Sequence, residues 1–155
     1  MPGASDNPSP LKVSGVIFSG PRKYGDFSWM MIQEEYQNAL FVFNDNEQQY
    51  KAHRDDPASI EGCMAGGGNA IIRPYQCEAK PRAAGIPTGP NYHSLTPEVK
   101  QIVDEAIAAI RDIVLKNGYN QIFYSANAEG KLGTHIFAPG DDVKTYILQQ
   151  LKSLE

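Results

Sequence analysis

NALFVFNDN, residues 38–46, is the stretch that decides how the rest of the chain is arranged. The unbroken apolar run over residues 39–43 is typical of a central strand that is covered on both faces. The stretch then becomes polar at Asn44, Asp45 and Asn46. Ligands of open α/β sheets bind outside the carboxyl ends of the strands. These three side chains therefore form either a polar turn, which Asn and Asp favour, or one wall of a ligand site.

Strand and helix signals alternate along the chain around this central strand. Thr96 and Pro97 have the residue types of an N-cap and a first helical position, and apolar residues then recur at helical spacing. We expect further strands at 11–19, 82–89 and 121–125, helices at 27–35, 96–117 and from 141 onward, and a loop or frayed helix at 47–61. This order predicts an α/β fold, a compact three-layer domain with a mostly parallel sheet and helices on both faces.

The composition is that of an ordinary globular domain, with 41% hydrophobic and 21% charged residues. We expect residues 1–10, which are polar and contain several prolines, to be a disordered lead-in, and residues 11–155 to form one domain. A net charge of −4 without a basic run argues against long nucleic-acid partners. The chain has neither a membrane-length apolar stretch nor the apolar region of a signal peptide, so we expect no membrane partner and a cytoplasmic location.

The cysteines of the chain, Cys63 and Cys77, flank a glycine-rich loop. In a cytoplasmic protein we expect them to be free thiols, with a disulfide as the alternative. Two cysteines and three scattered histidines do not have the usual ligand spacing of a zinc site. The sequence therefore predicts neither a bound metal nor a cofactor.

The glycine-rich loop belongs to the stretch AGGGNAIIR, residues 65–73. Three consecutive glycines favour a loop whose backbone approaches another group closely, because glycine loses the most conformational freedom on folding. The residues after them can begin a helix that ends at Pro74, so free N–H groups and the positive end of a helix dipole would meet at the loop. The loop is therefore either an anion site, where Arg73 would neutralise phosphate, or a tight turn with Arg73 in a surface ion pair.

Polar residues follow three strands of the expected sheet, at 44–46, at Thr88-Gly89 and at 125–127. The carboxyl ends of parallel strands meet at one edge of a sheet, so we expect these residues and the glycine loop to form a single crevice. Backbone amides for phosphates and short polar side chains for ribose hydroxyls suit a nucleotide. The candidate ligand-binding residues are Asn44, Asp45, Asn46, Gly66, Gly67, Gly68, Asn69, Arg73, Thr88, Gly89 and Asn127.

The order of these motifs resembles that of macrodomains, the family that binds ADP-ribose. FVFNDN, the glycine-rich loop and AGIPTG occur in the same order in small uncharacterised phage and bacterial proteins, which the chain also resembles. Macrodomains have a longer segment between the second and third motifs. The macrodomain resemblance implies that Asn44 and Asp45 lie near a ribose. It also implies that the 66–68 amides face a diphosphate and that Thr88 and Gly89 close over the phosphates.

Three functions are compatible with these features. The first is binding of a small ADP-ribose-like, NAD-derived or cyclic nucleotide, in the manner of phage anti-defence proteins that sequester a signalling nucleotide. The second is hydrolysis of an ADP-ribosyl or cyclic-nucleotide bond, with Asp45 or His135 as the catalytic base. The third is a protein-interaction module in which the glycines serve packing alone. We place binding without turnover first, and a homo-oligomer whose neighbouring subunit completes the site is compatible with so small a domain.

Overall fold

The computed structural model describes residues 10–134 and 137–155, so the expected lead-in lies almost wholly outside the described residues. Within them the chain forms one parallel sheet with the strand order β1-β4-β2-β3. The strands are β1 (Lys12–Val16), β2 (Ala39–Asp45), β3 (Ala83–Pro87) and β4 (Gln121–Ser125). The unbroken apolar run of residues 39–43 is buried in β2, between β4 and β3, as the sequence predicted.

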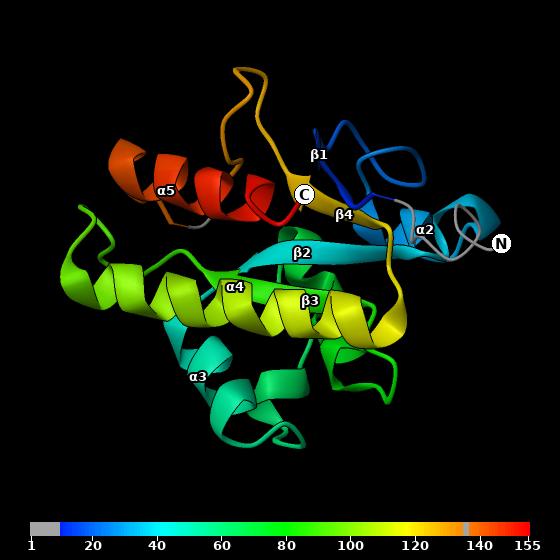
Figure 1. The fold of residues 1–155 in the computed structure, drawn as a ribbon, viewed down its shortest axis with the longest axis horizontal. Coiled ribbons are helices and arrows are strands. Elements are labelled where there is room, and N and C mark those ends of the chain that lie inside the picture. The colour runs from blue at the N-terminus through cyan, green and yellow to red at the C-terminus, as the bar shows by residue number, and fades with distance from the viewer. Residues whose placement is uncertain (1–9, 135–136) are drawn as a thin grey trace, which may run out of the picture.

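Helical segments cover both faces of this sheet. They are α2 (Phe27–Met30), α3 (Glu47–Asp55), α4 (Pro97–Asn117), α5 (Asp141–Lys152) and the 3-10 segments η1 (Glu34–Tyr36), η2 (Glu61–Cys63) and η3 (Gly68–Cys77). Helices α4 and α5 lie next to each other on one face (Figure 1), where they pack on side chains such as Leu40 and Ile122. On the opposite face α2 and η3 pack on Phe41, Phe43 and Phe123. The predicted three-layer α/β domain is confirmed.

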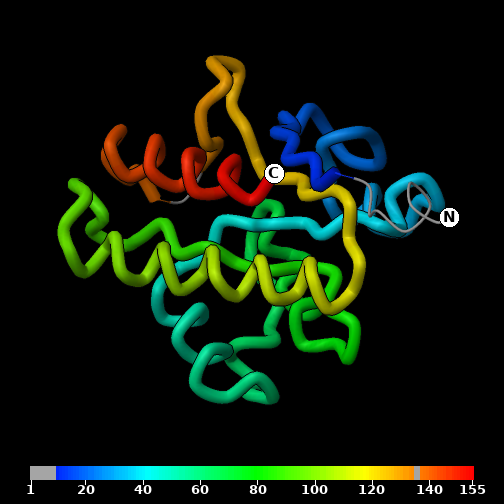
Figure 2. Tube along the Cα trace, in the orientation of Figure 1, coloured from blue at the N-terminus to red at the C-terminus, as the bar shows by residue number. Residues whose placement is uncertain are grey.

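The ends of α4 follow from its sequence. The Thr96 side chain accepts a hydrogen bond from the Val99 N–H at 3.2 Å, and Gly118 ends the helix in the left-handed conformation with φ 66°. The C-terminal helix α5 ends beside the edge strand β1, as Figure 2 shows. There Lys152 Nζ donates to the Val13 carbonyl at 2.6 Å, which ties the C-terminal helix to the first strand.

Two helical segments differ from expectation. The segment at 27–35 is a single α-turn, α2, followed by the 3-10 segment η1. The helix after the glycines does not end at Pro74 but continues through it to Cys77 as the 3-10 segment η3. Proline is excluded from α-helix interiors because it removes an i to i−4 hydrogen bond and clashes with that carbonyl. The hydrogen bonds of a 3-10 segment run from i to i−3, so η3 lacks one such bond at Pro74, which has no N–H to donate.

The topology creates a crevice between β2 and β4. After β2 the chain runs through α3 and η2 to η3, which lies on the same face of the sheet as α2. After β4 it runs to α5, which lies on the opposite face. Neighbouring parallel strands whose following connections leave on opposite faces form a topological switch point, where α/β proteins bind ligands. Within the described residues, no helix has the length and apolarity required to span a membrane.

Candidate functional site

A cavity of about 660 Å³ opens at this switch point. It is lined by segments that follow all four strands and by the glycine loop. The lining residues are Phe18, Pro21, Asp26, Ser28, Asn44, Asp45, Asn46, Gln49, Ala65, Gly66, Gly67, Gly68, Asn69, Ala70, Ile71, Arg73, Thr88, Ser125, Gly133, Thr134 and Phe137. The structure thus brings together the predicted residues 44–46, 66–69, Arg73 and Thr88.

Two predicted residues do not line the cavity. The Gly89 carbonyl accepts from the Glu47 N–H at 2.8 Å, beside the start of α3. Asn127 Oδ1 accepts from the N–H groups of Glu129 and Lys131, so this side chain closes its own turn. Both residues serve local backbone geometry. His135, the second candidate base, lies outside the described residues.

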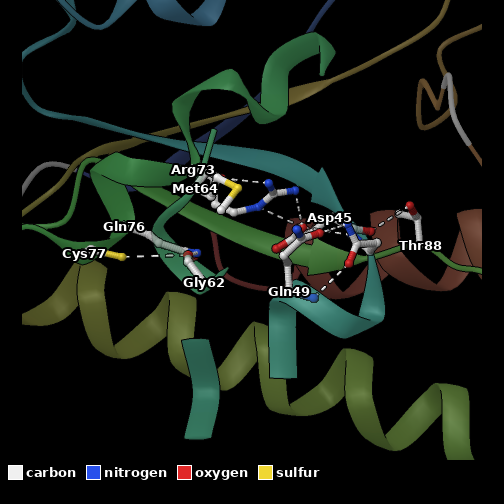
Figure 3. A network of polar contacts seen from close by, with 9 residues as sticks. Asp45, Gln49, Gly62, Met64, Arg73, Gln76, Cys77 and Thr88 are labelled. Atoms are coloured by element: carbon white, nitrogen blue, oxygen red, sulfur yellow. Dashed lines mark hydrogen bonds and ion pairs between the residues drawn. The ribbon is translucent and has the colours of Figure 1, made fainter. Parts of the chain in front are cut away.

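Asp45 and Arg73 form a buried ion pair at the carboxyl end of β2. Figure 3 shows the guanidinium of Arg73 reaching from η3 to Asp45. Its Nη2 and Nε donate to Asp45 Oδ1 at 2.7 and 3.2 Å, and its Nη1 donates to the Met64 carbonyl at 2.9 Å. The side chains of Arg73 and Asp45 are 4% and 0% exposed. Arg73 therefore joins β2 to the glycine loop from inside the protein, and it is not a surface ion-pair partner.

Burial raises the pKa of Asp45 above its ordinary value, although Arg73 and the Asn46 N–H act in the opposite direction. Asp45 Oδ2 is buried and has no hydrogen-bond partner among the described residues. Arg73 therefore holds Oδ1 alone, while Oδ2 stays unpartnered in a residue that lines the cavity.

Asn46 and Thr88 are likewise engaged with the protein itself. Asn46 Oδ1 accepts from the Gln49 N–H at 2.8 Å and so caps α3. The Thr88 hydroxyl donates to the Asp45 carbonyl at 3.2 Å. We call Asp45, Asn46, Arg73 and Thr88 the paired set, because each of their side chains forms hydrogen bonds within the protein, although Asp45 Oδ2 has no partner among the described residues.

The glycine loop presents polar groups that the fold does not satisfy. The Gly66 N–H donates to the Ala70 carbonyl and the Ala70 N–H to the Gly67 carbonyl, each at 3.0 Å. Among the described residues, no acceptor is found for the N–H groups of Gly67, Gly68 and Asn69, which begin η3 and line the cavity. We call these three N–H groups the open set. Free amides at the start of a helical segment attract anions.

The three glycines are present for different reasons. A Cβ on Gly66 would lie 2.7 Å from Nη1 of Arg73, so the ion pair requires glycine there. Gly68 has φ +57°, a conformation that favours glycine, and a Cβ there would meet nothing within 4 Å. Gly67 is exposed and has an extended backbone, with φ −85° and ψ 163°, which other residues adopt readily. Backbone conformation therefore does not explain the glycine at position 67.

Sequence reasoning missed the segment that follows β1. Phe18 is 50% exposed at the cavity, and Asp26 accepts hydrogen bonds from the Arg22 N–H and the Ser28 hydroxyl, both at 2.8 Å. Desolvation alone would raise the pKa of Asp26, but these hydrogen bonds outweigh it and lower the pKa. This segment was predictable from the sequence, because a first strand parallel to the others must have its carboxyl end at the edge of the sheet where the other strands end.

The Asn69 side chain fixes the position of the open set through contacts with β4 and α2. Its Nδ2 donates to Ser125 Oγ at 3.0 Å, at the end of β4, and its Oδ1 accepts from the Phe27 N–H at 3.3 Å, at the start of α2. The side chain of Asn69 thus joins η3 to β4 and α2, while its own N–H remains free. Asn44, on β2, donates to the Gly133 carbonyl on the far side of the cavity.

The expectation of free thiols is wrong for this structure, in which Cys63 and Cys77 form a disulfide. Segment η2 and the end of η3 lie against each other and bring the two Cα atoms within 6.0 Å, a separation that a disulfide spans. The loop that it closes contains the open set and Arg73. His53 of α3 is the third member of this cluster, with Nδ1 3.7 Å from Cys77 Sγ.

Comparisons with protein-family models, curated proteins and solved structures find no match to this chain.

Proposed function

We propose that the cavity binds a small nucleotide of the ADP-ribose, NAD-derived or cyclic-nucleotide type, in a macrodomain-like manner. The observation that carries the proposal is the open set, three neighbouring N–H groups without a protein acceptor at the start of η3. Phosphate oxygens are strong acceptors, and several amides aimed at one anion are the usual device by which a protein backbone binds phosphate.

The rest of the cavity suits the remainder of such a ligand. Its volume of about 660 Å³ lies in the usual range for small-molecule sites. Asp26, whose pKa is lowered, stays ionised at neutral pH and accepts hydrogen bonds from ribose hydroxyls or from a base amino group. Phe18, half exposed at the cavity, offers a face on which a base can stack.

Gly67 supports the same function. Its backbone conformation does not require glycine, and its N–H belongs to the open set. A residue without a side chain at this position allows phosphate to approach the amides closely.

We place binding ahead of hydrolysis. Asp45 is buried against Arg73, and that favours a structural role over a catalytic one. A protein that binds a nucleotide without consuming it acts by sequestration, removing a signalling nucleotide from solution. Analytical ultracentrifugation with and without nucleotide tests whether a second copy of the chain takes part.

Calorimetric titration of the wild type with ADP-ribose, NAD, cyclic ADP-ribose and 3′,5′-cyclic nucleotides tests the proposal. Gly67→Asp and Gly67→Asn form a matched pair, because the two side chains have nearly the same shape and only Asp carries a charge. We expect one of the ligands to bind with one-to-one stoichiometry, and Gly67→Asp to weaken it at least tenfold relative to Gly67→Asn. Tenfold is about 1.4 kcal/mol, less than a charge-assisted hydrogen bond contributes.

Absence of binding at millimolar ligand, or equal affinities of the two variants, would overturn the proposal. Chromatography of the ligand recovered after incubation separates binding from hydrolysis, because a binder returns it unchanged. A product that appears with the wild type and persists in Asp45→Asn would assign the chemistry to another residue. If no small ligand binds, the protein-interaction module takes precedence.

A further inference from the structure

We propose that Cys63, Cys77 and His53 bind a zinc-type divalent metal ion when the disulfide between the two cysteines is reduced. The three residues come from η2, η3 and α3, and one ligand atom of each lies within 4.8 Å of the other two. Two thiolates and an imidazole are a common donor set for Zn²⁺. The inference does not depend on nucleotide binding.

The position of His53 carries the proposal. Zn–S bonds of about 2.3 Å and Zn–N bonds of about 2.1 Å in a tetrahedral site place the sulfur and nitrogen atoms about 3.6 Å apart. His53 Nδ1 lies 3.7 Å from Cys77 Sγ, so this pair already has the separation of two ligands on one ion. The two sulfur atoms have to move apart only to about 3.8 Å, the distance across the same tetrahedron.

Contacts other than the disulfide hold the three residues together. The side chain of Gln76, which is 8% exposed, donates to the Gly62 carbonyl at 2.8 Å and so joins the residues adjacent to the two cysteines. A Cβ on Gly62 would lie 2.7 Å from the Cα of His53, so this glycine allows η2 to approach α3 closely. The Ser59 hydroxyl adds a hydrogen bond to the Ala52 carbonyl of α3. The thiols of the reduced protein therefore remain beside His53.

The chemistry of the two steps is balanced. A dithiol reductant such as dithiothreitol supplies two electrons and two protons, which convert the disulfide into two thiols while the reductant becomes a cyclic disulfide. The metal ion then displaces both thiol protons into solvent, and its own charge does not change. All three residues are only partly buried, so water has access to a fourth ligand position.

A metal ion at this place would close the same loop as the disulfide, between Cys63 and Cys77. The loop contains the open set and Arg73, so its ends are held together in an oxidising compartment by the covalent bond and in a reducing one by the metal. Sequence spacing did not indicate this site, because positions 53, 63 and 77 follow no familiar zinc pattern.

The test uses the chain of residues 1–155 and Co²⁺ as a spectroscopic probe. The chain is reduced with dithiothreitol, desalted without oxygen and titrated with Co²⁺, and Zn²⁺ is then added in competition. We expect one Co²⁺ per chain with thiolate charge-transfer absorption and the strong visible bands of tetrahedral coordination, lost when Zn²⁺ displaces it. The oxidised protein should show neither the thiolate charge-transfer absorption nor the visible bands.

His53→Ala should weaken Co²⁺ binding by the reduced chain at least tenfold and alter the visible bands. His93→Ala is the matched control, since this exposed histidine lies elsewhere, and it should behave as wild type. Circular dichroism checks that the variants fold, and His53→Gln replaces His53→Ala if the smaller side chain prevents folding. Absence of thiolate bands in the reduced wild type, wild-type affinity in the His53 variant, or equal binding by the oxidised protein would overturn the proposal.

Discussion

The paired set and the open set line the same cavity, but the fold treats their polar groups in opposite ways. Asp45 and Arg73 are buried and form an ion pair through Asp45 Oδ1, and the Thr88 hydroxyl donates to the backbone of β2. The N–H groups of residues 67–69, by contrast, have no acceptor among the described residues. The two sets look alike in the sequence, because both are polar and lie at a strand end or a helix start, but their hydrogen bonding in the structure differs.

The difference teaches which residues are candidates for ligand contact. A buried polar group that is paired stabilises the fold, whereas a group left without a partner beside a cavity is available to a ligand. Asp26 also lies on the cavity, where the Arg22 N–H and the Ser28 hydroxyl bond to its carboxyl group and lower its pKa, while the pKa of Asp45 is raised by burial. The expected effects of substitution separate the two sets, from the largest to the smallest.

Arg73→Met has the largest expected effect. It leaves the carboxylate of Asp45 buried without its partner, which costs about 3–5 kcal/mol of the free energy of unfolding. Urea denaturation followed by circular dichroism measures the loss. The double variant Asp45→Asn/Arg73→Met removes both charges and should recover much of it, since neutral replacement of a buried ion pair is often tolerated.

Arg54→Met is the matched control for this prediction. Arg54 contacts Asp55 and Glu105 at the surface, where its side chain is 38% exposed. We expect a loss below about 1 kcal/mol, as for other surface ion pairs. Equal losses for Arg73→Met and Arg54→Met would mean that the ion pair of the paired set does not stabilise the fold.

Removal of the disulfide acts on the loop that carries the open set. Replacing Cys63 and Cys77 by Ala, measured with a chelator present, should lower the free energy of unfolding by about 3 kcal/mol, the chain-entropy value for a loop of roughly 15 residues. Amide hydrogen exchange should accelerate in residues 64–76 more than in β2. Uniform acceleration across both segments would indicate that the loop and the strand open as one unit.

Much of the fold could be predicted from local sequence patterns. The apolar run of β2, the Thr96 cap of α4 and the strand at 121–125 each depend on residues close together in the chain, so pattern and structure agree. The 3-10 segment η3 could not be predicted in this way. Pro74 indicated the end of a helix, but η3 continues through it to Cys77 as a 3-10 segment packed on the sheet.

The candidate site was predictable in place but not in detail. The carboxyl ends of the strands marked the cavity, because parallel strands share one edge. The pairing of Asp45 with Arg73 joins residues 28 positions apart, and that of Asn69 with Ser125 joins residues 56 apart. Which polar group is paired and which is free depends on such distant contacts, and local patterns do not contain them. The approach of His53 to Cys77, across 24 positions, escaped prediction for the same reason.

The two carboxyl groups should give opposite pH dependences of stability. The raised pKa of Asp45 means that its contribution is greatest below its ordinary pKa of 3.8 and is lost as the pH rises through the raised value. The lowered pKa of Asp26 means that its contribution is present above 3.8 and is lost as the pH falls through the lowered value.

Urea denaturation of the wild type, Asp45→Asn and Asp26→Asn between about pH 3 and pH 7 measures both contributions, each with a slope of at most about 1.4 kcal/mol per pH unit. Each variant lacks one of the two carboxyl groups and serves as the reference for that position. Relative to its variant, the wild type should lose stability with rising pH at position 45 and gain it at position 26. Slopes of the same sign would contradict the opposite pKa shifts of the two carboxyl groups.

Alanine substitutions in the glycine loop have the smallest expected effects on stability. Gly68→Ala forces a Cβ into the left-handed conformation, which costs about 1–2 kcal/mol although the space beside it is open. Gly67→Ala keeps an ordinary extended backbone at an exposed position and should change the free energy of unfolding by less than about 0.5 kcal/mol. If the open set serves a ligand, Gly67→Ala should weaken nucleotide binding despite this small effect, because the new methyl group stands beside the amides. A variant with lower stability and unchanged affinity would assign Gly67 to the fold as well.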